Sequence, residues 1–281
     1  MTNIDFKKSI QTSVDLSIQE DVGSGDLTAS LISSSALSEA SIISRVDCVL
    51  CGRDWVERTF RSLDDSIHLT WHNQDGDQIS VGHPICTLRG PARALLTGER
   101  TALNFLQTLS AVATKTKRYV KAVSHTKAKI LDTRKTMPNL RMALKYAVKT
   151  GGGENHRVGL FDGVLIKENH IIASDGITNA LRSTQHLDAN IPIQIEVESI
   201  QQLKEALNHG AKLILLDNFT LEAMEEAVRI VDGQALLEAS GGITLKSIVK
   251  IAETGVDRIS IGALTKDIEA IDLSMRFKFV N

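Results

Sequence analysis

The chain has 281 residues, of which 42% are hydrophobic and 23% are charged, a composition typical of a globular protein with a sizeable core. Lysine and arginine number 32 against 34 aspartate and glutamate residues, so the net charge of -2 gives the molecule no overall attraction for nucleic acid or a membrane surface. No run approaches the roughly 18 apolar residues of a membrane span, and the N-terminus lacks the apolar stretch of a signal peptide. Three cysteines are too few for a disulfide framework, which favours a cytoplasmic location.

The first third of the chain predicts a small α+β domain. Ile10, Val14 and Ile18 recur every four residues, which indicates an amphipathic helix from Asp5 to about Glu20, ended by a turn over residues 21–26. The segments that follow are short, rich in β-formers and bounded by glycine and aspartate. We expect an antiparallel sheet from Ala40–Leu50, Ile67–His72 and Ile85–Leu88, with one helix over Trp55–Leu63.

The pattern changes after Gly90-Pro91, where a helical stretch of at most one break runs from about Ala92 to Val123. Short apolar runs then alternate with amphipathic helices, which indicates a parallel sheet buried on both faces. A series of six such strands favours an α/β barrel over an open doubly wound sheet, and no GxGxxG motif follows the first strand. The expected strands are Lys129–Asp132, Gly163–Lys167, Ile193–Val197, Leu213–Leu216, Ala235–Ala239 and Arg258–Ile261, and the expected helices are Asn139–Lys149, Asp175–His186, Ile200–His209, Leu221–Val231 and Leu245–Glu253.

The C-terminal segment Asp272–Val280 alternates like a strand, and we expect it to return to the N-terminal sheet. The chain is therefore expected to form an N-terminal domain over residues 1–110, joined by about 270–281, and a barrel domain over residues 111–269.

Polar residues follow all six expected barrel strands, at the positions where barrel enzymes carry their chemistry. The first two strand ends, together with the loop between them, are cationic. Arginine binds carboxylates and phosphates through two parallel N–H groups, while lysine supplies a point charge. These candidate anion-binding residues are Arg134, Lys135, His156, Arg157 and Lys167.

The middle strand ends carry Glu196 and Asp217, which suit Mg²⁺ or sugar hydroxyls. The last two ends, Ser240-Gly241-Gly242 and Ser260-Ile261-Gly262, place glycine directly before an expected helix, where backbone N–H groups can approach a phosphate closely. The residues thus predict phosphate on one side of a pocket, sugar and metal in the middle, and an acidic second substrate opposite.

Structural explanations compete with several of these assignments. Either carboxylate could be purely structural. Arg141, Lys145 and Lys149 are expected on the solvated face of their helix. Residues 151–153 are three glycines, more than a helix cap needs, which favours a ligand loop. Cys48 and Cys51 lie three apart on an expected strand, where their side chains point to opposite faces, and no second pair exists, which argues against zinc.

Four blocks, Thr133–Pro138, Lys145–Val148, Asn155–Arg157 and Lys167–His170, closely resemble quinolinate phosphoribosyltransferase, also called carboxylating nicotinate-nucleotide pyrophosphorylase. The resemblance extends over essentially the whole chain through Glu20-Asp21, Gly25–Thr28, Gly98–Asn104 and Ser240–Ile243. It implies an N-terminal α+β open-faced sandwich followed by an incomplete, seven-stranded α/β barrel. It also implies phosphoribosyl transfer from phosphoribosyl pyrophosphate to quinolinate, with Mg²⁺, to give nicotinate mononucleotide, CO₂ and pyrophosphate in de novo NAD synthesis.

The resemblance implies a role for each candidate. Quinolinate would be held by Arg134, His156, Arg157 and Lys167, with Thr133 beside them and Lys135 facing the pyrophosphate. Ribose and Mg²⁺ would be bound by Glu196 and Asp217, which with Lys135 are the expected catalytic residues. The 5′-phosphate would contact Ser240, Gly241, Gly242, Ser260, Ile261 and Gly262. A homodimer is expected, with Arg100 reaching quinolinate in the neighbouring subunit.

Two other functions remain open at this point. A Schiff-base lyase on a barrel would use Lys135 or Lys167 as its amine. A non-catalytic relative would bind a phosphorylated ligand without turnover, and it would be free to lose Glu196, Asp217 or the His156-Arg157 pair, all of which this chain retains.

Overall fold

The computed structural model describes residues 6–279, so Asp5 and Val280, the expected ends of the first helix and last strand, lie outside the described residues. The chain forms two compact units. The first unit draws its residues from 1–115, 136–152 and 265–281, and the second from 116–135 and 153–264. Segment 136–152, expected in the barrel domain 111–269, therefore groups with the N-terminal residues.

The sheet of the first unit has four strands, β1 (Leu37–Ser44), β3 (His68–Trp71), β5 (Pro84–Pro91) and β12 (Leu273–Phe279), in the order β12-β1-β5-β3. All its pairings are antiparallel, and β12 returns to this sheet as the sequence predicts. The expected strand over Ala40–Leu50 is in fact two strands. The Ser44 hydroxyl bonds the backbone of Val46 and turns the chain, so that β2 (Cys48–Val49) pairs instead with β4 (Gln78–Ile79).

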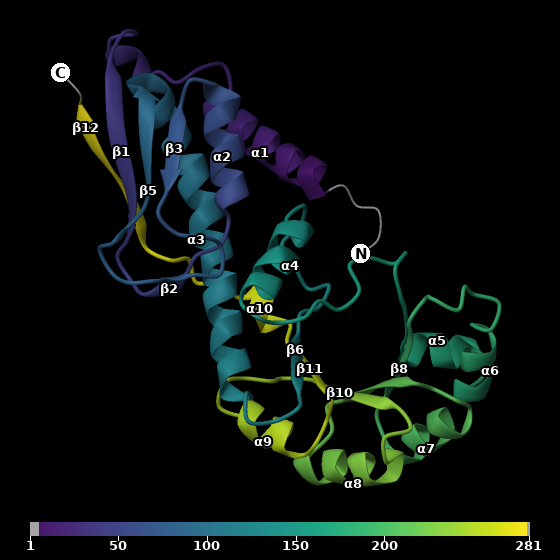
Figure 1. The fold of residues 1–281 in the computed structure, drawn as a ribbon. Helices are drawn as coiled ribbons and strands as arrows, with labels where there is room; N and C mark the ends of the chain where they lie inside the picture. The colour runs from purple at the N-terminus through teal and green to yellow at the C-terminus, as the bar shows by residue number, and fades with distance from the viewer. Residues whose placement is uncertain (1–5, 280–281) are drawn as a thin grey trace. The chain divides into compact units, whose positions relative to one another are not determined.

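One face of this sheet packs against helices, as Figure 1 shows. The helices of this region are α1 (Phe6–Val22), α2 (Arg53–Leu63) and the unbroken α3 (Ala92–Ala122), with a short 3-10 turn η1 (Ala29–Leu31). Alternate strand residues such as Ala40, Ile42 and Leu88 face Phe60 and Leu103 in one apolar core. Burial of this single face drives the assembly of the unit.

Helix α4 (Arg141–Thr150) belongs to the first unit because its Tyr146 packs against aromatic residues of that unit. The Tyr146 ring lies 5.2 Å from Phe6 and 5.6 Å from Trp55, between centroids, and its hydroxyl donates to Asp75 at 2.8 Å. Asp75 also accepts from the backbone N–H groups of Gly52 and Arg53, which caps the N-terminus of α2.

Replacing Tyr146 with phenylalanine should lower the free energy of unfolding by about 1–3 kcal/mol, because it leaves a buried carboxylate with one donor fewer. Burial raises the pKa of Asp75, and the Tyr146 hydrogen bond partly offsets that rise. Asp75 therefore takes up its proton at a higher pH than an ordinary aspartate, so the cost of the substitution should be largest near neutral pH and shrink as the pH falls. Urea denaturation of Tyr146→Phe, with and without Asp75→Asn, measures this coupling. Equal costs of Tyr146→Phe in both backgrounds would show that the hydroxyl contributes nothing through Asp75.

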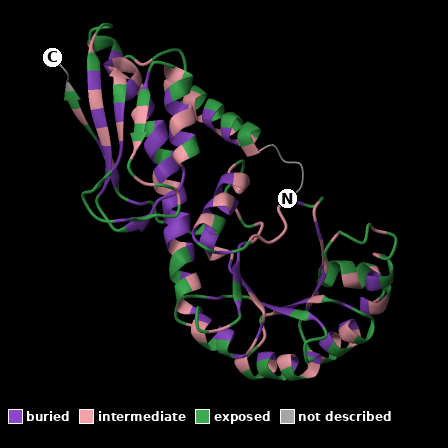
Figure 2. Cartoon of the chain, viewed as in Figure 1, coloured by how far each residue is buried: buried purple, intermediate pink, exposed green. Residues whose placement is uncertain are grey.

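The second unit is built on a six-stranded parallel sheet in the order β6-β11-β10-β9-β8-β7. Figure 1 shows its strands curving inside an arc of helices, and Figure 2 shows these helices with mixed burial around buried strands. The strands are β6 (Lys129–Leu131), β7 (Val164–Ile166), β8 (Ile193–Val197), β9 (Leu213–Asp217), β10 (Leu236–Ser240) and β11 (Arg258–Ser260). The helices are α5 (Glu168–Ala173), α6 (Ile177–Arg182), α7 (Ile200–Asn208), α8 (Leu221–Val231) and α9 (Ile248–Glu253), with α10 (Ala263–Lys266) following β11.

The barrel is incomplete, with β6 and β7 as the end strands of its sheet. Within residues 6–279 the sheet has the six strands that the sequence pattern predicts, where the family resemblance implied seven. Next to β6, Glu154 forms a single parallel bridge with Leu131, its N–H donating to Ile130 at 2.8 Å. A single residue, Glu154, thus pairs with β6 where a seventh strand would lie.

Two further expectations differ from the structure. The helix expected over Asp175–His186 is shorter than expected: α6 begins at Ile177, because Asp175 has a left-handed φ of 54 and Gly176 a φ of 118, and it ends at Arg182. Helix α5, which precedes this turn, was not expected. Lys145 is only 2% exposed, so its expected place on a solvated face of α4 is wrong. The pattern of charged residues at helical spacing did not distinguish this lysine from Lys149, which is exposed.

The cysteines serve packing. Cys48, Cys51 and Cys86 are all buried as free thiols, and burial raises the pKa of Cys86 to about 12. No cluster of three or more metal-ligating side chains occurs in residues 6–279. None of the helices in that range combines the length and apolar character that crossing a membrane requires.

Candidate active site

All predicted site residues except Arg100 lie at the carboxyl ends of the parallel strands in the second unit or in the loops between these strands. The parallel register places Ser240 of β10 opposite Asp217 of β9, and Ser260 of β11 opposite Leu131, the last residue of β6. Side chains two apart on a strand share a face, so Glu196 of β8 lies on the same face as Gln194. The sheet thereby presents its polar strand ends along one rim.

Glu196 is a rim carboxylate whose charge interacts with those of several other predicted site residues. Burial raises its pKa; the charge of Asp217 raises it further, while the charges of Lys167 and Lys135 lower it. The Lys167 Nζ lies 3.9 Å from the Glu196 Oε2. Lys135 follows β6 and Lys167 follows β7, which are the two end strands of the sheet. Because the charges of both lysines act on one carboxylate, the sheet must curl far enough to bring its two ends towards Glu196.

The loop that carries His156 and Arg157 is held in place by Asp132. This aspartate is 0% exposed and was not among the predicted site residues. Its carboxylate accepts from Asn155 Nδ2 at 2.6 Å and from the His156 backbone N–H at 2.9 Å, which holds the loop after Glu154 against the end of β6. Arg157 is half-buried, and burial followed by the charge of Arg134 lowers its pKa. Two guanidinium groups that repel each other in a partly desolvated place favour a bound anion.

His156 lies in this loop, with both ring nitrogens bonded to protein groups. Nδ1 accepts from the backbone N–H of Arg157 at 2.8 Å, and Nε2 lies 2.8 Å from Gln194 Oε1. The ring is therefore held in one orientation beside the arginine. The prediction that it holds a substrate carboxylate remains a prediction.

The glycine-rich side exposes the backbone at Gly241 and Gly242. Gly241 and Gly242 have φ of 111 and 54, and a Cβ at Gly241 would collide with the Asn218 side chain. Gly262 lies beneath Lys135, since a Cβ added there would come 3.1 Å from the Lys135 Cδ. Helix α9 begins only at Ile248, so the expectation of a helix directly after Gly242 is wrong. The backbone N–H groups at Gly241 and Gly242 therefore belong to a loop, whereas α10 begins at Ala263, directly after Gly262, as expected.

Thr133 and Arg100 complete the predicted set. The Thr133 hydroxyl accepts from the Lys135 N–H at 3.0 Å, which shapes the turn after β6. Arg100 lies on α3 in the first unit and is exposed. Asp132, Gln194 and Glu238 were not among the predicted site residues; their signal in the sequence was a polar residue inside, or directly after, an apolar strand.

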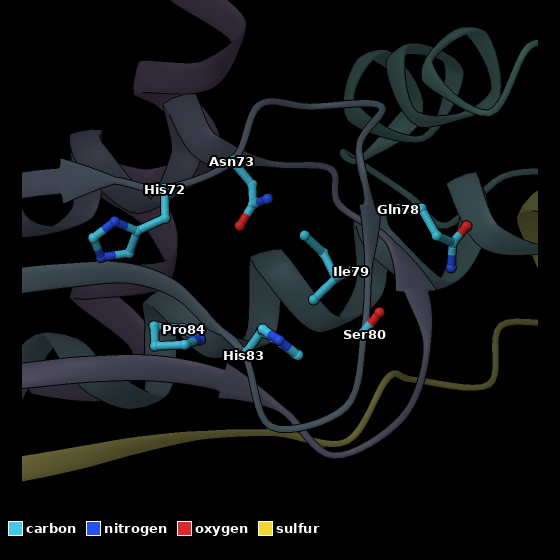
Figure 3. Close-up of a pocket in the computed structure, with 7 residues that line it drawn as sticks. All are labelled: His72, Asn73, Gln78, Ile79, Ser80, His83 and Pro84. Carbon is cyan, nitrogen blue, oxygen red and sulfur yellow. The ribbon is translucent and has the colours of Figure 1, made fainter.

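The first unit has a pocket of its own, of about 460 Å³ (Figure 3). The residues around it are His72, Asn73, Gln78, Ile79, Ser80, His83 and Pro84, from β3 to the start of β5. This lining contains no carboxylate, lysine or arginine. The strand ends of the second unit, where cations and carboxylates meet, are the better candidate for chemistry.

The incomplete barrel, with charged residues along the rim of its strand ends, is the architecture of an α/β-barrel protein. Residues 112–276 match the family described as quinolinate phosphoribosyl transferase, C-terminal domain, and residues 26–110 match its N-terminal domain. The chain belongs to the quinolinate phosphoribosyltransferase family.

Relatives resemble the chain along nearly its whole length. A probable carboxylating nicotinate-nucleotide pyrophosphorylase of Bacillus subtilis is 41% identical over 91% of this chain and 89% of its own. The corresponding protein of Mycobacterium leprae is 39% identical over 95% and 93%. The structure of the nicotinate-nucleotide pyrophosphorylase from Francisella tularensis has a TM-score of 0.95, with 44% identity and 97% of each chain covered.

Proposed function

We propose that this enzyme transfers the phosphoribosyl group of phosphoribosyl pyrophosphate to the ring nitrogen of quinolinate and releases one carboxylate as CO₂. The products are nicotinate mononucleotide, CO₂ and pyrophosphate, a step of de novo NAD synthesis. The observation that carries the proposal is a rim on which Arg134 lies near Arg157, and Lys167 lies 3.9 Å from Glu196, whose charge interacts with that of Asp217. Relatives named for this reaction cover the chain almost entirely.

Quinolinate carries two adjacent carboxylates, and the cationic side is suited to both. Arg134 and Arg157 offer forked donors, and Lys167 adds a point charge, with Thr133 and His156 beside them. The cations hold the ring so that its nitrogen faces the ribose carbon. Positioning of this kind can supply much of the rate enhancement without a side-chain nucleophile.

The bond from the ribose carbon to pyrophosphate breaks with its electron pair on the leaving oxygen, and the positive charge on ribose is stabilised by Glu196 and Asp217. Lys135 faces the departing pyrophosphate. The ring-nitrogen lone pair forms the new bond, which makes the nitrogen cationic. The carbon–carboxylate bond then breaks towards the ring, and the ring carbon takes a proton from solvent.

Mg²⁺ is the proposed cofactor, with Glu196 and Asp217 as its protein ligands. Burial raises the pKa of Glu196 and the charge of Asp217 raises it further, so the pair would gain from a cation between or beside them. Two carboxylates are a typical protein contribution for Mg²⁺, which takes further oxygen ligands from phosphates and water. Bound there, the ion would neutralise charge on the pyrophosphate.

We also propose a homodimer in the cytoplasm, with Arg100 serving the neighbouring subunit's site. Arg100 is exposed on α3, and exposed Leu27 and Leu31 lie near η1, which Asp26 ties to α3 through its bond to Thr97. Exposed apolar side chains beside a charged group suit a self-complementary interface. The cysteines are reduced, as in a cytoplasmic protein.

The two other functions make different predictions. A Schiff-base lyase would be trapped by borohydride with a carbonyl substrate, through Lys135 or Lys167. That reagent would leave a phosphoribosyltransferase active. A non-catalytic relative would bind phosphoribosyl pyrophosphate without consuming it.

We expect quinolinate to be a substrate and nicotinate, which has one carboxylate, not to be one. Nicotinate leaves part of the cationic side unpaired, and a site with unpaired buried polar groups rejects the analogue that lacks their partner. Purified enzyme with phosphoribosyl pyrophosphate and Mg²⁺ is incubated with each acid, and nicotinate mononucleotide is quantified by mass spectrometry. Omission of Mg²⁺ with added chelator is the control for the cofactor. Efficient conversion of nicotinate would overturn the substrate assignment.

A further inference from the structure

We infer that Glu238 and Gln194 are positioning residues that fix the ring of His156, and through it the backbone at Arg157. The inference rests on the proposed function, in which Arg157 holds a carboxylate of quinolinate. Glu238 lies two residues before Ser240 on β10, and Gln194 lies two before Glu196 on β8. Both therefore lie one layer below the strand-end groups and on the same face.

Both side chains are buried. Glu238 is 0% exposed and Gln194 is 4% exposed. The Glu238 Oε2 accepts from Gln194 Nε2 at 3.1 Å. Its Oε1 has no hydrogen-bond partner within the described residues 6–279 and lies 3.7 Å from His156 Nε2, too far for a hydrogen bond. An incompletely paired buried carboxylate is costly, so a stabilising role alone does not explain it.

The hydrogen bonds from Glu238 to Arg157 form a chain with one possible direction. Gln194 turns its NH₂ towards the Glu238 oxygen, so its Oε1 faces His156 and can only accept. His156 must then carry its proton on Nε2. At the other end, the Arg157 N–H donates to Nδ1, which must keep its lone pair. The acceptor at one end and the backbone donor at the other select the same Nε2–H tautomer.

With this tautomer, the loop is held at two adjacent backbone positions, His156 and Arg157. Asp132 holds the His156 N–H, and the His156 ring holds the Arg157 N–H. A carboxylate at position 238 only accepts, whereas an amide there could also donate, so in Glu238→Gln the Gln194 amide is free to turn and present NH₂ to Nε2. The ring would then need its proton on Nδ1, opposite the Arg157 N–H. The guanidinium would be displaced, and small displacements in a site are costly for catalysis.

The kinetic test compares Glu238→Gln and Gln194→Leu with the wild type. Outer partners of functional histidines typically contribute about 10- to 100-fold, so we expect kcat/KM for quinolinate to fall by about that factor. The KM for phosphoribosyl pyrophosphate should stay within about twofold, because Glu196 and Asp217 are untouched. Glu226→Gln, an exposed glutamate on α8, is the matched control and should change nothing. Unchanged quinolinate kinetics, or equal effects on both substrates, would overturn the inference.

A spectroscopic test reads the tautomer directly in the wild-type enzyme. Long-range ¹H–¹⁵N correlation on the wild-type enzyme identifies the tautomer of each histidine, and His156→Gln assigns the resonance. We expect only the Nε2–H form at His156, and a mixture or the other form in Glu238→Gln. A wild-type Nδ1–H tautomer would refute the inference. If wild-type enzyme does not turn over quinolinate at all, the proposed function fails, while the tautomer still decides the positioning role.

Discussion

Arg157→Ala is expected to cripple turnover of quinolinate while leaving the fold intact. Truncating one partner of a desolvated charge pair costs about 2–5 kcal/mol, which corresponds to a loss of about 30-fold to 4,000-fold in kcat/KM. Arg157 is suited to this role because it is half-buried and lies close enough to Arg134 for that charge to lower its pKa. Arg134→Ala should have an effect of similar size.

Steady-state kinetics with each substrate varied in turn, and thermal unfolding of each variant, test this expectation. Arg157→Lys keeps the charge but loses the forked donor, so it should recover only part of the activity. Arg229→Ala, on the outer helix α8, is the control. Near wild-type activity of Arg157→Ala would show that the cationic side does not bind quinolinate as proposed. A large drop in its melting temperature would mean that the arginine acts through the fold.

Arg100→Ala is expected to be nearly inactive as a pure protein and to be rescued by subunit exchange with Lys135→Ala. In a hybrid dimer, if Arg100 serves the neighbouring site, one site has both residues intact and the other lacks both. Random equal mixing makes about half of the dimers hybrid, and half of their sites are intact. The mixture should therefore regain roughly a quarter of the wild-type sites.

Exchange is confirmed by intact mass or by pull-down with two different tags before activity is measured. Arg118→Ala, another arginine on α3, replaces Arg100→Ala in the control mixture and should be active without any partner. Confirmed exchange without recovery would mean that Arg100 serves its own chain or no site. Recovery above a quarter would point to preferential formation of hybrid dimers, and recovery below a quarter to unequal mixing; the mass measurement detects both.

The sequence predicted the barrel because each buried strand is a short apolar run and each outer helix is amphipathic. It predicted the rim because polar residues at parallel strand ends must meet at one edge. Local patterns could not predict that α4 joins the first unit, since that depends on the contacts of Tyr146 with Asp75, Phe6 and Trp55. Periodicity likewise failed at Ser44, where one side-chain bond ends β1 and divides an expected strand.

The buried polar residues below the rim were the hardest part of the site to predict from the sequence. Asp132, Gln194 and Glu238 lie in or directly after apolar strands, where a polar residue can equally be an isolated structural feature. Their importance became visible through distances: Asp132 to the His156 N–H, and Glu238 through Gln194 to the His156 ring. Side-chain pairing across non-adjacent strands β8 and β10 leaves no signature in the order of residues.

The fate of the quinolinate carboxylate tests the proposed reaction most directly. Quinolinate labelled with ¹³C in the carboxylate next to the ring nitrogen is incubated with the enzyme, phosphoribosyl pyrophosphate and Mg²⁺, and labelled CO₂, pyrophosphate and nicotinate mononucleotide are quantified together. We predict that all three appear in equal amounts, that the mononucleotide carries no label, and that Arg157→Ala slows all three alike. Pyrophosphate released without labelled CO₂, or labelled mononucleotide as the final product, would contradict the proposed transfer with decarboxylation.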